Sequence, residues 1–79
     1  MRRKKKIIMK GNFNMITLKD WLEENDFDIN DIKNQDIKVY DEHYNNVYIY
    51  DLADADDYEV LDSYSEEGVW KVIVEDLDK

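Results

Sequence analysis

Apolar residues recur at helical spacing over residues 18–25. Leu18, Trp21 and Leu22 share one face of a helix in this register, and the residues between them are polar or charged. Thr17 is suited to cap the N-terminus, because its hydroxyl can accept a hydrogen bond from the backbone N–H three residues on. The spacing therefore predicts a short helix over this range.

Two later segments alternate apolar residues with polar or aromatic ones. Residues 37–40 and 47–50 both have the period of two that is typical of a β-strand. The polar stretch between them ends in Asn45-Asn46, and asparagine tolerates the positive φ of a turn. These segments predict a β-hairpin with a long loop.

A second pair of alternating segments lies near the C-terminus. Residues 58–64 and 69–74 flank a polar loop that ends in Gly68, which can supply the left-handed residue of a bulged hairpin. The polar segments 26–35 and 52–57 are predicted as connections, the first with a single helical turn.

Taken together, these elements predict an α+β fold. One short N-terminal helix is expected to pack on a four-stranded antiparallel sheet made of two hairpins. The expected core consists of Ile16, Leu18, Trp21, Leu22, Phe27, Ile37, Val39, Val47, Ile49, Leu61, Trp70, Val72 and Val74.

Charge is distributed unevenly along the chain. The formal net charge is −9, yet all twenty Asp and Glu residues lie from Asp20 onward and basic residues dominate the first ten positions. This acidic excess repels itself and opposes compactness. It either serves solubility alone or provides a negative surface for binding. Direct binding of the acidic domain to nucleic acid or to a membrane is disfavoured, because both depend on Lys and Arg.

The basic extension, residues 1–14, differs from the acidic domain, residues 15–79. Lys10-Gly11 back-translates to a purine-rich sequence shortly before Met15, as a ribosome-binding site before a start codon would. We therefore favour Met15 as the native start. The alternative is a basic arm that folds back on the acidic domain or touches nucleic acid.

The sequence offers no recognisable catalytic or metal-binding set. It has no cysteine, and His43 is its single histidine. Asp26, Asp28 and Asn30 match the opening of a calcium loop, but Asp31 stands where that loop needs glycine. We therefore predict a protein that is not an enzyme and that uses no cofactor or metal. The lack of cysteine and of a long apolar run favours a cytoplasmic location.

Tyrosine and acidic residues are the candidates for partner binding. If apolar residues alternate inward, the tyrosines of both hairpins point outward, and tyrosine together with carboxylates suits a protein interface. The alternative is that these tyrosines are present only because β-strands favour tyrosine, or that a second copy of the chain covers this face. The predicted tyrosine face consists of Tyr40, Tyr48, Tyr50, Tyr58 and Tyr64. The predicted acidic stretch consists of Asp51, Asp54, Asp56, Asp57, Glu59 and Asp62.

The acidic domain, its α+β pattern and its Tyr/Asp/Glu surface resemble small phage and mobile-element inhibitors of the anti-CRISPR and anti-restriction type, many of which are acidic DNA mimics. Alternate strand residues lie about 6.5–7 Å apart, comparable with the phosphate spacing along one DNA strand. The resemblance implies a non-enzymatic inhibitor that occupies a basic nucleic-acid-binding groove of a nuclease in the host cytoplasm. The alternative is a homodimeric structural or regulatory adaptor that binds a protein partner through the tyrosine face.

Overall fold

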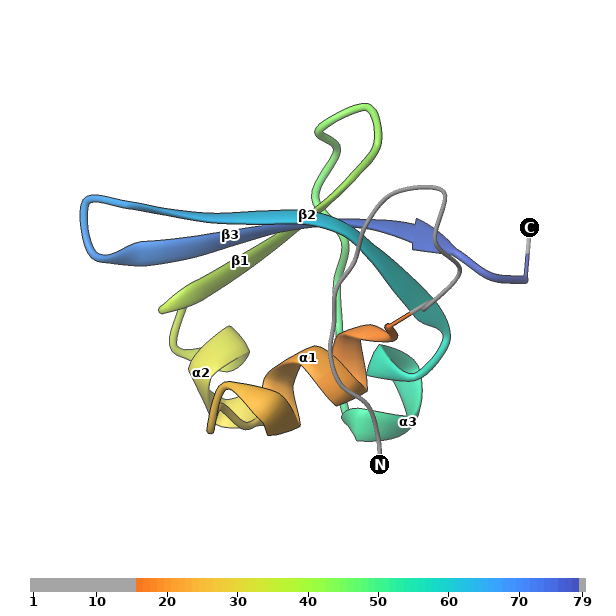
Figure 1. Cartoon of the computed structure of the whole chain (residues 1–79), viewed down its shortest axis with the longest axis horizontal. Helices are drawn as coiled ribbons and strands as arrows, with labels where there is room; N and C mark the ends of the chain where they lie inside the picture. The colour runs from red at the N-terminus through yellow and green to blue at the C-terminus, as the bar shows by residue number, and fades with distance from the viewer. Residues whose placement is uncertain (1–15, 79) are drawn as a thin grey trace.

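The computed structural model describes residues 16–78, which form three helices and a three-stranded sheet (Figure 1). The helices are α1 (Leu18–Glu24), α2 (Ile29–Lys33) and α3 (Leu52–Ala55). The strands are β1 (Ile37–Asp41), β2 (Tyr58–Glu66) and β3 (Val69–Asp76). The sheet order is β1-β3-β2, and the helices lie on one face of the sheet (Figure 1).

The prediction of a four-stranded antiparallel sheet made of two hairpins is wrong, because the first hairpin does not form. Residues 47–50 form no strand, and Asn46, just before them, meets β1 at an isolated bridge with Tyr40. At this bridge the Val47 N–H donates to the Val39 carbonyl (2.9 Å). The fold is α+β, but the sheet is mixed.

Strand β1 pairs in parallel with β3, where Val39 lies opposite Val72. The physical reason lies in β3 itself, since residues 72–74 are apolar and buried on both faces of the sheet. A strand buried on both faces belongs in the interior of a sheet and needs a neighbour on each edge. Strand β2 provides one neighbour and β1 provides the other.

The β2–β3 hairpin is present, with a tighter turn than predicted. Glu67 (φ 56°) and Gly68 (φ 82°) form a two-residue turn in which both φ angles are positive. A register shift between Val60 and Asp62 leaves Leu61 as the extra residue of a β-bulge. The side chain of Leu61 is 47% exposed, so its predicted place in the core is wrong.

The bulge also changes which side chains of β2 face the helices. Tyr58, predicted to point outward, and Val60, absent from the predicted core, pack against the core before the bulge. Every other predicted core residue is buried or packs against the core. The buried cluster consists of Leu18, Trp21, Leu22, Ile37, Val39, Ile49, Ala55, Val72 and Val74.

Side-chain caps explain where the helices begin. The predicted first helix is confirmed, and the Thr17 hydroxyl accepts from the Asp20 N–H (3.2 Å). Helix α2 begins after Asp28, which forms a reciprocal capping box with Asp31. Helix α3, where a connection was predicted, begins after Asp51, whose side chain caps it in the same manner as Thr17 caps α1.

Residues 1–15 and Lys79 lie outside the described residues, and with them the predicted basic extension and the predicted start at Met15. Among residues 16–78, no helix is long and apolar enough to cross a membrane, and the longest, α1, has seven residues.

Candidate functional site

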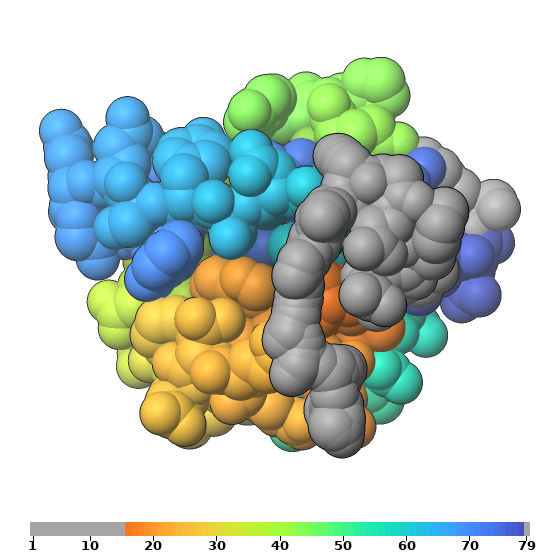
Figure 2. Space-filling view, in the orientation of Figure 1, coloured from red at the N-terminus to blue at the C-terminus, as the bar shows by residue number. Residues whose placement is uncertain are grey.

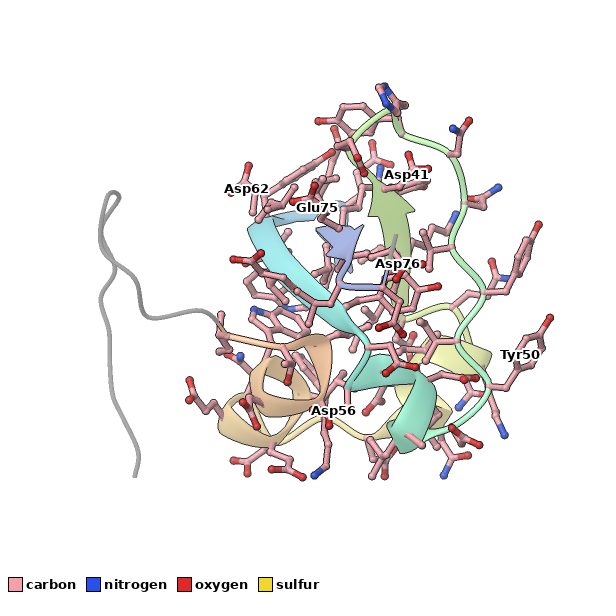
Figure 3. All side chains as sticks on the ribbon, turned by 90° about the vertical axis from the view of Figure 1, so that its right-hand side faces the viewer. Asp41, Tyr50, Asp56, Asp62, Glu75 and Asp76 are labelled. Atoms are coloured by element: carbon pink, nitrogen blue, oxygen red, sulfur yellow. The ribbon has the colours of Figure 1, made fainter. Side chains whose placement is uncertain are left out.

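Carboxylates gather at the end of the sheet where β1 and β3 finish and β2 begins (Figure 3). They come from segments that are far apart in the chain: the end of β1, helix α3 with the turn after it, the start of β2 and the end of β3. We call this set the acidic end. It consists of Asp41, Glu42, Asp54, Asp56, Asp57, Glu59, Asp62, Glu75, Asp76 and Asp78.

The pKa of Asp57 reflects how close these carboxylates lie to one another. Its pKa is raised, first by partial desolvation of the carboxyl group and then by repulsion from the carboxylates around it. Those neighbours are Asp78, Asp54, Asp56 and Asp76. Three of the acids predicted for partner binding, Asp54, Asp56 and Asp57, therefore belong to one electrostatically coupled cluster.

The end of β3 contributes acids that the predicted acidic stretch omitted. Strand β3 continues to Asp76, and Glu75 lies opposite Glu59 of β2. Opposite residues of antiparallel strands are about 4.5–5.5 Å apart, so the two glutamates add like charge to the same patch. The predicted pairing of the second hairpin was the sequence signal that could have brought these acids together.

A pocket of about 240 Å³ opens at the acidic end. Asp41, Glu42 and Asp76 line it together with His43 and Tyr58. The pKa of Tyr58 is raised, first by desolvation and then by the negative charge of Asp76 and its neighbours. The pocket is therefore a place where a cationic group would be favoured over an anionic one.

Asp41 also fixes the loop after β1. Its Oδ1 accepts from the backbone N–H groups of His43 (2.8 Å) and Asn45 (2.9 Å). The pKa of Asp41 is lowered, chiefly by the bond from the Asn45 N–H. Asp41 therefore remains ionised over the neutral range and contributes a fixed negative charge.

The predicted acidic stretch does not run as one straight line, because the chain turns from α3 into β2. The Asp51 carboxylate accepts from the Asp54 N–H (2.9 Å), and the Asp54 carboxylate accepts from the Tyr50 N–H (3.0 Å). Asp51 caps the start of α3 and is not among the carboxylates that raise the pKa of Asp57. Asp62 follows the bulge and lies beside Ile73 in the register.

Tyr40 and Tyr64 lie on the sheet face opposite the helices, as predicted. Tyr40 is beside Ile73 in the register, and its ring centroid is 6.0 Å from that of Tyr44. The pKa of Tyr64 is raised, first by desolvation and then by Tyr44, which was not predicted as a site residue. The loop that carries Tyr44 stands above β2 and β3, where it is coloured green (Figure 2).

The other predicted tyrosines lie elsewhere. Tyr58 faces the helices and packs against the core. Tyr48 and Tyr50 project from the 47–50 segment and are 69% and 71% exposed. The predicted tyrosine face is therefore divided into three parts. Tyr40 and Tyr64 lie on the outer sheet face, Tyr48 and Tyr50 are an exposed pair, and Tyr58 is partly buried.

Within residues 16–78, no three His, Asp or Glu side chains are grouped so that they could hold a metal ion. Asp28, from the calcium-like motif, caps α2 and accepts from the Asn30 N–H (2.9 Å).

Comparison of the chain with protein-family models, with curated proteins and with solved structures finds no match.

Proposed function

We propose that the protein is a non-enzymatic inhibitor whose acidic end occupies the basic nucleic-acid-binding groove of a CRISPR or restriction nuclease in the host cytoplasm. The observation that supports this proposal is the convergence of carboxylates from four chain segments at one end of the sheet. Neighbouring residues along and across the strands of a sheet lie about 4.5–7 Å apart, comparable with phosphates on one DNA strand, and Glu59 and Glu75 are such a pair.

The electrostatics of the acidic end favour a cationic partner. The raised pKa of Asp57 reflects repulsion among neighbouring carboxylates as well as desolvation. Arginine or lysine side chains from a nuclease groove would relieve that repulsion and form charge-assisted hydrogen bonds. Binding should therefore lower the pKa of Asp57 toward its ordinary range.

The test is inhibition of DNA cleavage by a panel of purified CRISPR effectors and restriction endonucleases. The triple variant Asp56→Asn, Asp57→Asn, Asp76→Asn removes three charges from the acidic end. We expect it to inhibit the sensitive enzyme at least about tenfold more weakly than the wild type, because it removes three cationic contacts.

The matched control removes three charges elsewhere on the surface. Glu23→Gln, Glu24→Gln and Asp26→Asn neutralise exposed acids at the end of α1, away from the acidic end. This control should inhibit as the wild type does, and inhibition should weaken steeply between about 50 and about 300 mM salt. Equal inhibition by both triple variants, or an affinity independent of salt, would show that the acidic end does not act as a DNA mimic.

A second candidate function is a homodimeric structural or regulatory adaptor. The observation that favours it is the outer cluster of Tyr40, Tyr44 and Tyr64, which lies on the sheet face without helices. Tyrosine buries a large area at small entropic cost, so this face suits a protein partner or a second copy. Sedimentation equilibrium distinguishes the two functions, since a monomer at all accessible concentrations removes the homodimer.

A further inference from the structure

A groove of about 670 Å³ lies at the β1 edge of the sheet. Strand β1 and the 47–50 segment form its walls, and they diverge from the bridge at Tyr40 and Asn46. From this bridge β1 leads back toward α2, whereas the 47–50 segment leads to α3 (Figure 1). Ile37 and Ile49 line the groove.

The groove differs in charge from the rest of the described surface. None of the acidic residues among residues 16–78 lines it, although the chain carries twenty. Two of the four lysines in this part of the chain, Lys33 and Lys38, do line it. Tyr48 and Tyr50 add exposed aromatic rings to the same groove. The lining therefore combines apolar, aromatic and polar side chains with two lysines and without a carboxylate.

One wall of the groove is an open strand edge. The Trp70 N–H donates to the Asp36 carbonyl (3.0 Å), so alternate residues from Asp36 direct their backbone groups to β3. Ile37 and Val39 therefore direct their backbone N–H and carbonyl groups to the groove. The Val39 carbonyl accepts from Val47, but nearer α2 no strand among residues 16–78 covers Ile37. Such an edge is a template for an added strand.

We propose that this groove binds an extended segment of a partner protein as an added strand beside β1. The segment would carry apolar side chains at alternate positions, which pack over Ile32 and Ile49, and a carboxylate that pairs with Lys33 or Lys38. Backbone hydrogen bonds to Ile37 supply affinity, and the alternating side chains supply specificity.

Charge complementarity selects this occupant. The basic residues 2–10 of the chain would bring like charge to Lys33 and Lys38, which disfavours them. The negative net charge of the domain does not exclude an acidic segment, because surface charges farther than about 8–10 Å are largely screened at physiological salt. This binding mode is independent of the acidic end.

The experiment is selection from a displayed library of random ten-residue peptides on the immobilised wild-type protein. We expect enriched peptides to alternate apolar residues with others and to contain Asp or Glu. Synthetic copies should shift the backbone amide resonances of Ile37 and Val39 in ¹⁵N-labelled protein. N-methylation of the peptide amides that face β1 should abolish binding, whereas methylation at the intervening positions should not.

The matched variants are the double change Lys33→Glu, Lys38→Glu and the control Lys19→Glu, which lies on α1 outside the groove. The double variant should bind the selected peptides at least about tenfold more weakly, and the control should bind them as the wild type does. Rising salt should weaken this binding only modestly, because a single lysine–carboxylate pair contributes to it, whereas binding through the acidic end should weaken steeply, so the two proposals can fail separately.

Three outcomes of the peptide experiments would overturn the proposal. They are the absence of enrichment, selected peptides that bind the double variant unchanged, and resonance shifts that fall outside β1 and the 47–50 segment. Concentration-dependent dimerisation that Lys38→Glu abolishes would also overturn it, because a second copy would then occupy the groove.

Discussion

The bulge in β2 can be tested with a pair of truncations. Val74→Ala shortens a side chain in the central strand that is fully buried, whereas Leu61→Ala shortens the side chain at the bulge, which is 47% exposed. Simple alternation along β2 would instead direct Leu61 into the core. The two variants therefore separate a bulged strand from a regular one.

The magnitudes follow from burial. Val74→Ala removes two buried carbon groups at about 0.8 kcal/mol each and leaves a cavity, so it should lower the free energy of unfolding by about 2–3 kcal/mol. Leu61→Ala removes three carbon groups that are about half exposed, and it should cost about 1 kcal/mol or less. A buried Leu→Ala would cost about 2–5 kcal/mol.

Urea unfolding followed by tryptophan fluorescence measures both costs. Trp21 and Trp70 contact each other edge to face with ring centroids 5.7 Å apart, so their emission reports the core directly. With a urea slope of about 1 kcal/mol/M, the midpoint should fall by about 2–3 M for Val74→Ala and by about 1 M or less for Leu61→Ala. If Leu61→Ala costs as much as Val74→Ala, β2 runs without the bulge.

Three further changes test the caps, the turn and the charges. Thr17→Ala should lower stability by about 1 kcal/mol in thermal unfolding, because it removes the cap of α1, and Thr17→Ser should restore most of it. Gly68→Ala should cost about 1 kcal/mol, because alanine is strained at φ 82°; an unchanged melting temperature would argue against the positive-φ turn. The folded-state pKa of Asp57 is raised, so its protonation should stabilise the fold as pH falls through that pKa. The folded-state pKa of Asp41 is lowered, so its ionised carboxylate stabilises the fold above its ordinary pKa, and this stabilisation is lost as pH falls through the folded value. A melting temperature that rises continuously to the lowest pH would contradict this account.

Local sequence signals predicted the elements that local interactions define. The cap at Thr17 and the helical spacing of Leu18, Trp21 and Leu22 predicted α1 with its observed start. The β2–β3 hairpin followed from alternation around Gly68. In both cases the residues that interact lie within a few positions of each other.

Pairing between distant segments was where the prediction was wrong. Residues 37–40 and 47–50 have the alternation of a hairpin, yet β1 pairs with β3, 33 positions away at Ile37 and Trp70. The available signal was the apolar run at residues 72–74, which is typical of a central strand. Its middle residue, Ile73, is absent from the predicted core and is buried.

The short helix α3 was predicted as a connection because four residues show no helical period. Its signal was the pair Asp51 and Asp54, each of which accepts a backbone hydrogen bond at the start of the helix. The sequence contained the acids of the acidic end but not their arrangement. Glu59 and Glu75 meet because β2 and β3 pair, and Asp41 joins them because β1 runs parallel to β3.

The position of β3 in the chain has a consequence for synthesis. This strand is the last described element to leave the ribosome, and β1 and β2 both need it as a neighbour. While the nascent chain still holds β3 in the exit tunnel, α1, α2 and β1 are already outside without a sheet to pack on. Maturation should therefore occur in one late step after translation of Asp76, and ribosome-stalled chains that end before Val69 should remain sensitive to protease.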